Sequence, residues 1–90
     1  MGCVIMVDEM RVSGMLNYCH MTVDDVDLQP LHDFAARLGL RREWFKEGTV
    51  PHYSLSRSQR QQALRLGAVY VPSREMFTIA RDHKKARERQ

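Results

Sequence analysis

The chain has 90 residues, which is enough for one small domain and too few for a second. Hydrophobic residues make up 43% of it and charged residues 28%, which is typical of globular domains and excludes a disordered chain. No apolar run approaches the roughly 18–20 residues of a membrane-spanning helix, and no basic segment precedes the apolar residues 3–7 as in a signal peptide. We therefore expect a cytoplasmic protein that makes no contact with a membrane.

The charge is distributed unevenly, although the net charge is only +3. Residues 1–36 contain six acidic residues and one arginine, whereas residues 37–80 contain eight basic and three acidic residues. The last ten residues add five basic and two acidic ones, so the whole basic excess lies there. Proteins built around nucleic-acid binding usually carry a larger basic excess over the folded domain. The pattern predicts a single domain over residues 1–82 and a basic C-terminal tail over residues 83–90.

The first half of the chain predicts two strands and a helix. Cys3–Val7 is a run of apolar and β-branched residues that suits a strand buried on both faces. A short strand is expected at Leu16–His20. Leu28–Leu38 has the apolar periodicity of a helix, with Asp27 as its N-cap and Gly39 as its terminator.

The second half predicts two further helices around another strand. Ser56–Gln59 has the pattern of a capping box and opens a helix that Gly67 ends. Ala68–Val71 is a second candidate for a buried strand, and Ser73 is expected to cap a third helix that continues into the tail. A short middle strand is expected to end near Val50. Alternating strands and helices favour an α/β domain of two or three layers, with a short, mostly parallel sheet and about three helices.

Polar side chains are expected at one rim of this sheet, because open parallel sheets bind ligands at the carboxyl ends of their strands. The segments after the strands and the loop before the first helix supply the set Asp8, Arg11, His20, Asp24, His52, Tyr53 and Ser73. Arg57 adds a cation at the start of the second helix, whose first amides can receive an anion. We predict catalytic roles for Asp8, His20 and His52, and ligand contacts for Arg11, Asp24, Tyr53 and Arg57.

Three chemistries would use these residue types. A divalent metal of unspecified identity would draw its ligands from Asp8, His20, Asp24 and His52. Alternatively, a histidine oriented by Asp8 or Asp24 would act as general base on a phosphoester or glycosidic bond, while Arg11 or Arg57 stabilises negative charge. Third, His20 would activate Cys19 as a nucleophile, although neighbours on an extended chain point to opposite faces. Structural histidines and surface ion pairs are the alternatives to all three.

Two aromatic residues and one histidine are also candidates for a site. Trp44 and Phe45 either form a stacking platform for a base or cover one end of the core. His32 lies at the margin of the apolar stripe of the first helix, so we expect a half-buried ring bonded to backbone or water.

Five segments carry a resemblance: Val7–Arg11, Cys19–Met21, Leu31–Leu40 with Trp44 and Phe45, Pro51–Tyr53, and Arg65–Val69. In this order they resemble the small bacterial and phage proteins classed as domain of unknown function 4031, and the likeness covers nearly the whole chain. The closest matches are Ala36–Leu40, at the end of the helix, and the pair His52 and Tyr53. The family usually reads His-Tyr-Asp, whereas this chain has Ser54 in the third position. The resemblance implies an origin in a bacterium or a phage.

Functions of three classes remain open. The leading hypothesis is a pocket at the strand ends that binds, and in an enzymatic version hydrolyses, a phosphate-bearing small molecule or nucleotide. The alternative is a non-catalytic accessory protein that binds nucleic acid or a host protein through the tail and the second helix, with Arg57, Arg60 and Arg65. The third is a structural module that forms homo-oligomers through a sheet edge and the pair Trp44 and Phe45.

Overall fold

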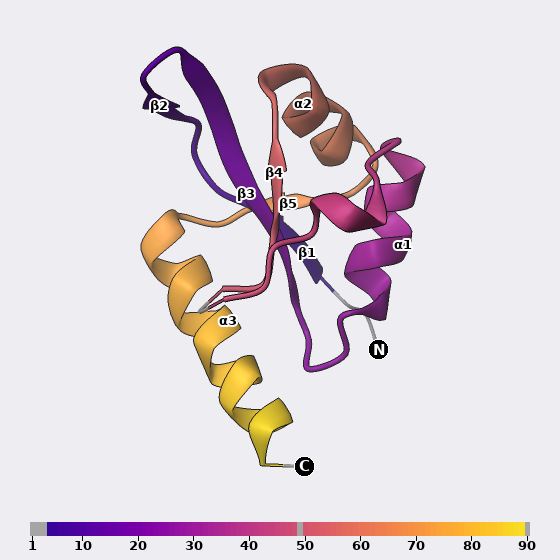
Figure 1. Ribbon diagram of the computed structural model, residues 1–90, viewed down its shortest axis with the longest axis vertical. Coiled ribbons are helices and arrows are strands. Elements are labelled where there is room, and N and C mark those ends of the chain that lie inside the picture. Colours follow the sequence, from indigo (N-terminus) through magenta and orange to yellow (C-terminus); the bar gives the residue numbers. More distant parts are fainter. Residues whose placement is uncertain (1–3, 49, 90) are drawn as a thin grey trace.

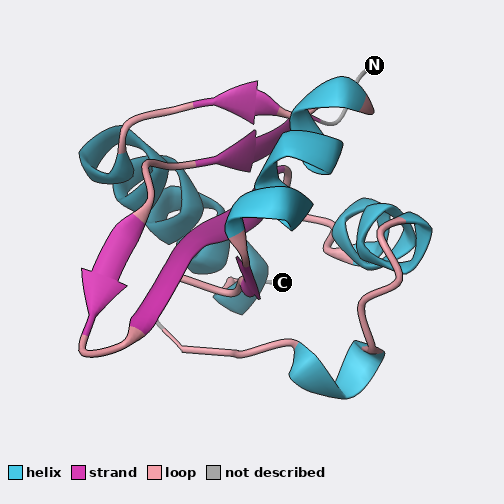
Figure 2. Ribbon diagram, turned by 90° about the horizontal axis from the view of Figure 1, so that it is seen from above, coloured by secondary structure: helices cyan, strands magenta, loops and turns pink. Residues whose placement is uncertain are grey.

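The computed structural model describes residues 4–48 and 50–89, in which five short strands form one mixed sheet with helices on both of its sides (Figures 1 and 2). The strands are β1 (Val4–Val7), β2 (Arg11–Ser13), β3 (Leu16–Asp24), β4 (Tyr53–Leu55) and β5 (Val69–Tyr70). The helices are α1 (Gln29–Arg37), α2 (Arg57–Arg65) and α3 (Ser73–Glu88), and the 3-10 helix η1 is Arg42–Trp44. The predicted strand from Cys3 is therefore confirmed from Val4 onward, while Cys3 itself lies outside the described residues.

The α/β class is confirmed, but the prediction of a mostly parallel sheet is wrong. β1, β2 and β4 all pair antiparallel with β3, and among the described strands only β5 runs parallel to its partner, β1. The reason is the turn at residues 14–15, where Gly14 has φ 61°. A parallel crossover needs a dozen or more residues, so a turn this short makes a hairpin. β3 consequently folds back on β2 and β1 and extends to Asp24, beyond the predicted end at His20.

The sheet separates two apolar layers, which gives the domain three layers in all (Figure 1). One face of β3 presents Cys19, Met21 and Val23 to the main core, which α1 and α2 cover with Leu31, Phe34, Ala35 and Ala63. The opposite face presents Thr22, and the residues Met6 of β1 and Met76 and Ala80 of α3 are buried on that side. The period of two along a strand explains this division, since successive side chains point to opposite faces.

The predicted helices α1 and α2 are both present, and the predicted capping box of α2 is confirmed. Ser56 and Gln59 form the capping box, in which the Ser56 hydroxyl accepts from the Gln59 amide and the Gln59 side chain accepts from the Ser56 amide. The chain leaves α2 at Gly67, whose φ of 113° suits a residue without a side chain. At α1 the N-cap is Leu28 rather than Asp27, although the Asp27 carboxylate accepts a hydrogen bond of 3.0 Å from the amide of Gln29.

Two predictions around β5 are wrong. β5 is not buried on both faces, because it lies at the edge of the sheet and leaves Val69 and Tyr70 about half exposed. Ser73 is not the N-cap of α3 but its first residue, after Pro72. The Glu9 carboxylate accepts a hydrogen bond of 3.0 Å from the Ser73 amide. Glu9 therefore caps the start of α3, the role predicted for the Ser73 hydroxyl.

The predicted tail is helical up to Glu88 as the C-terminal half of α3. Three of its side chains bond to the domain: His83 bonds to the Asp24 carboxylate at 2.6 Å, Lys84 donates to the Gly48 carbonyl, and Arg87 donates to the Val26 carbonyl. None of the helices in the described ranges is long and apolar enough to span a bilayer.

Candidate functional site

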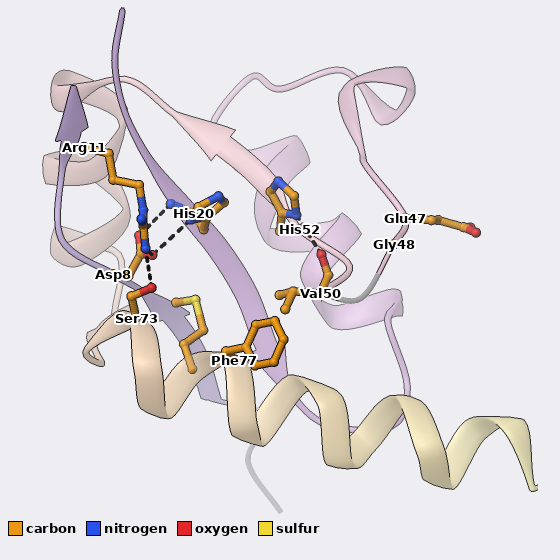
Figure 3. A pocket seen from close by; sticks show the side chains of 10 residues that line it. Asp8, Arg11, His20, Glu47, Gly48, Val50, His52, Ser73 and Phe77 are labelled. Atoms are coloured by element: carbon orange, nitrogen blue, oxygen red, sulfur yellow. Dashed lines mark hydrogen bonds and ion pairs between the residues drawn. The ribbon is translucent and has the colours of Figure 1, made fainter. Parts of the chain in front are cut away.

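A pocket of about 320 Å³ lies between the sheet and α3 (Figure 3). Its polar groups come from Asp8, Arg11, His20, His52 and Ser73, and its apolar wall comes from Val50, Met76 and Phe77. We call it the histidine pocket. Because β1 and β5 are parallel neighbours, their carboxyl ends meet and bring Asp8 and Ser73 to one edge, as the sequence predicted. Figure 3 shows the side chain of Glu47, at the pocket margin, pointing away from this polar group.

A bulge between β1 and β2 positions Asp8. Val7 pairs with Met21 and Arg11 pairs with Tyr18, so residues 8–10 lie opposite only residues 19–20. One extra residue on one strand bends it and re-aims its side chains. Asp8 keeps one ladder bond, from its amide to the carbonyl of His20 at 3.2 Å. The two residues therefore lie side by side, and His20 comes from within β3 rather than from the predicted loop.

The Asp8 carboxylate fixes the orientation of the His20 ring through two hydrogen bonds. Its Oδ1 accepts the backbone amide of His20 at 2.7 Å, and its Oδ2 accepts Nδ1 of the ring at 3.0 Å, although Asp8 is only 1% exposed. Burial alone would raise the pKa of Asp8, but the two hydrogen bonds from His20 and the nearby Arg11 charge outweigh it and lower that pKa. An ionised Asp8 accepts the proton of Nδ1, so the lone pair of the ring is on Nε2 whenever the ring is uncharged.

His52 is a second imidazole held in the same way. Its Nδ1 donates to the Val50 carbonyl at 2.7 Å, and its ring meets that of His20 edge to face, with 4.6 Å between the centroids. Burial lowers the pKa of His52, and the neighbouring His20 and Lys46 charges act in the same direction, against the Val50 hydrogen bond. His52 is therefore neutral near pH 7, and its Nε2 is also an acceptor.

Arg11 completes the polar group on the side of α3. One terminal nitrogen lies 3.5 Å from Asp8 Oδ2 and also donates to the Ser73 hydroxyl. Its Nε is buried and has no hydrogen-bond partner within the described part of the chain. A buried donor left without an acceptor is rare in folded proteins and is a point where an anion or water is expected. The sequence predicts a ligand contact for Arg11, and the structure places its side chain in the lining of the pocket.

Arg60 supports the site from the other face and was not among the predicted site residues. Its Nε donates to the backbone carbonyl of Asp8 at 2.9 Å, and its guanidinium lies 5.7 Å from the centroid of the Tyr70 ring. The sequence placed Arg60 on a basic face of the second helix, because nothing in the local pattern signals a contact across 52 residues.

The structure does not bring three of the predicted ligand residues to this pocket. Asp24 is on the same face of β3 as His20 but four residues further along, roughly 13 Å away at about 3.3 Å per residue. Tyr53 follows His52 directly and so points into the core, where its hydroxyl bonds to Nδ1 of His32 at 2.8 Å. Arg57 is exposed at the start of α2 and does not line the pocket.

The structure also bears on the two other predicted chemistries, a metal site and a Cys19 nucleophile. In residues 4–48 and 50–89, no three His, Cys, Asp or Glu side chains are grouped as ligands for a metal ion. Cys19 is fully buried on the opposite face from His20, and burial, with the Asp8 charge, raises the pKa of its thiol to about 11. A thiol with this pKa stays protonated, which is unfavourable for a nucleophile.

The two aromatic neighbours have separate roles. Phe45 packs against His32 and Tyr53 at one end of the core, whereas Trp44 is 49% exposed. His32 is half-buried as predicted, and its ring bonds to a side chain, the Tyr53 hydroxyl.

The sequence profile of the family described as "Protein of unknown function (DUF4031)" matches residues 5–83 of the chain. The chain belongs to this family. The match runs from β1 into α3 and includes all the polar residues of the histidine pocket. Within the DUF4031 match, His52 lines the pocket while Tyr53 fills the core, and Ser54 pairs with His20 across β3 and β4. No curated protein and no solved structure matches the chain.

Proposed function

We propose that the histidine pocket binds the phosphate group of a small molecule or nucleotide. The observation that carries this proposal is the buried Arg11 Nε, a cationic donor without a partner in the described structure, beside two imidazoles. Guanidinium groups match phosphate oxygens in charge and geometry, and Ser73 adds a hydroxyl. The negative charge of Asp8 is offset by the Arg11 guanidinium, which lies 3.5 Å from Oδ2.

The same geometry supports hydrolysis of the bound phosphoester. His20 Nε2 would take a proton from a water molecule as its oxygen forms a bond to phosphorus, and the bond to the leaving oxygen would break. Asp8 would hold the ring and stabilise the imidazolium that forms, and Arg11 would stabilise the negative charge on the phosphoryl oxygens. The leaving oxygen would take its proton from solvent.

A thermal-shift series tests the binding proposal. Inorganic phosphate and nucleoside mono-, di- and triphosphates are added with and without divalent metal ions to the wild type and to Arg11→Gln. A bound ligand at a hundred times its Kd stabilises by about 2.7 kcal/mol, and about 1 kcal/mol shifts the melting temperature of a domain this size by about 4–8 °C. We expect such a shift in the wild type and in Arg65→Gln, whose arginine is exposed at the end of α2, and none in Arg11→Gln. Equal shifts in all three proteins, or none in any, would contradict the proposal.

The accessory role in binding nucleic acid or a host protein remains a prediction. The structure uses part of its basic surface internally, since Arg60 bonds to Asp8 and Arg87 bonds to Val26. The exposed cations of α3 are Arg74, Arg81 and Lys85, and Arg89 is exposed directly after the helix. We also propose that the protein is cytoplasmic and comes from a bacterium or a phage. The unpaired thiol of Cys19 supports a location in a reducing compartment.

A further inference from the structure

A second concave surface adjoins the histidine pocket. It has a volume of about 730 Å³ and shares His20 and His52 with the pocket, so the two imidazoles lie where the two concavities meet. Its remaining side chains include Tyr18, Trp44, Lys46, Ser54 and Ser56. We call this surface the aromatic groove. It is more than twice as large as the pocket, so a mononucleotide with its phosphate in the pocket would leave part of the groove empty.

The lining of the aromatic groove suits unpaired bases and a sugar–phosphate chain. Trp44 is 49% exposed, and Tyr18 meets the His20 ring edge to face at 5.6 Å between centroids. Lys46 is exposed in the groove, and Arg41 lies 5.7 Å from the Trp44 ring centroid while also pairing with the carboxylate of Glu43. Exposed aromatic faces with cations beside them are how proteins bind single strands without reading sequence.

We propose that the ligand of this site is a single-stranded nucleic acid that runs along the aromatic groove and places one phosphodiester in the histidine pocket. Its flanking bases lie against Trp44 and Tyr18, and Arg11 contacts the phosphate inside the pocket. This inference rests on the proposed function of the pocket and adds the class of ligand. A duplex does not satisfy it, since paired bases are stacked on each other and cannot lie on Trp44.

The intrinsic fluorescence of the protein tests this directly, because Trp44 is the single tryptophan of the chain. The emission is followed while an eight-nucleotide single strand of thymidylate or uridylate, the matching duplex, or a mononucleotide is added. We expect saturable quenching by the single strands, with an apparent Kd at least tenfold lower than that of the mononucleotide. Quenching by the duplex at the same concentration would overturn the inference.

Binding of a labelled strand, followed by anisotropy, separates the contributions of the variants. Trp44→Ala is expected to weaken binding by about 5- to 150-fold, which corresponds to about 1–3 kcal/mol for one stacked base. The control is Leu66→Ala, since Leu66 is 39% exposed at the end of α2 and lines neither the groove nor the pocket. It should leave the affinity unchanged.

Two further variants distinguish failure of this inference from failure of the proposed function. If phosphate binds in an Arg11-dependent way, but the strand binds no tighter than a mononucleotide and leaves Trp44 unquenched, the inference fails and the pocket stands. If the strand binds Arg11→Gln as tightly as the wild type, Arg11 makes no phosphodiester contact and the inference is overturned, while the thermal-shift series alone decides the pocket proposal. If Lys85→Ala with Arg89→Ala abolishes binding while Trp44→Ala does not, the strand lies on α3 and the inference is overturned.

Discussion

Asp8 is a buried carboxylate that stays ionised because the chain surrounds it with donors. Both oxygens accept hydrogen bonds from His20, and the Arg11 guanidinium lies 3.5 Å from one of them. Without such partners, the free energy of hydration that a buried charge loses would far exceed the interaction energy that it gains in the folded protein. The same contacts that stabilise the charge also fix the tautomer of His20, so stability and the proposed chemistry depend on one side chain.

Replacement of Asp8 by asparagine should therefore affect both. We expect Asp8→Asn to lower the free energy of unfolding by about 1–3 kcal/mol, because hydrogen bonds to a charged group are lost and buried donors are left poorly paired. Urea denaturation measures this loss, and the matched control is Asp82→Asn, at an exposed position on α3. Equal stabilities of the two variants would contradict the role given to Asp8.

The pH dependence of stability follows from His52 and Asp8. The folded protein lowers the pKa of His52, so the unfolded chain takes up a proton first as the pH falls below about 6.5. The stability should therefore rise with pH through this range and level off above it, and the lowered pKa of Asp8 adds a further loss near pH 4. Denaturation from pH 5 to 8 checks this slope, which His52→Asn should reduce by up to about 1.4 kcal/mol per pH unit. An unchanged slope would show that His52 is not held neutral.

At the scale of elements, the sequence predicts well what is decided locally. Ser56 and Gln59 are three residues apart and contact each other, so the start of α2 can be predicted from spacing alone. Strand direction, by contrast, depends on the length of the segment that connects two strands. Only residues 14–15 connect β2 and β3, and this short connection makes the pair an antiparallel hairpin. Arg60 contacts Asp8 across 52 residues and Arg11 contacts Ser73 across 62 residues, and no local pattern encodes either contact.

The capping box offers a test at this scale. Ser56→Ala should lower the free energy of unfolding by about 1 kcal/mol, because an amide at the start of α2 loses its acceptor. Gln61→Ala, in the middle of the same helix and exposed, should change stability by at most a few tenths of a kcal/mol. Thermal unfolding of both variants gives the comparison, and a smaller effect for Ser56→Ala than for Gln61→Ala would contradict the assignment.

At the scale of the molecule, the predicted site is partly assembled and partly dispersed. Asp8, Arg11, His20, His52 and Ser73 converge, because the parallel pair of β1 and β5 brings two strand ends together and the hairpin adds β3. Asp24 and Tyr53 were placed at the rim on the assumption that β3 ended near His20 and that a strand ended before His52. Asp24 is instead the last residue of β3 and Tyr53 the first residue of β4, so the rise per residue separates Asp24 from the pocket and the period of two turns Tyr53 away from it.

The C-terminal end of α3, residues 83–88, contacts segments that are far from it in the chain. A chain that ends at Asp82 lacks the contacts of His83, Lys84 and Arg87 with the domain. We expect it to unfold with a free energy lower by about 1–3 kcal/mol, at roughly 1 kcal/mol for each hydrogen bond. The double variant Lys85→Ala with Arg89→Ala, at exposed positions, should be as stable as the wild type. Equal stability of the truncated chain would show that residues 83–88 are dispensable for the fold.

The most direct test of the phosphate pocket is a titration of the four histidine side chains by NMR. Inorganic phosphate is added to protein labelled with ¹⁵N, and the ring nitrogens are followed at constant pH. The account predicts saturable shifts at His20 and His52 and at the Arg11 Nε–H group, with His32 and His83 unchanged, because the latter two lie outside the pocket. Shifts that are equal at all four histidines, or that remain in Arg11→Gln, would contradict it.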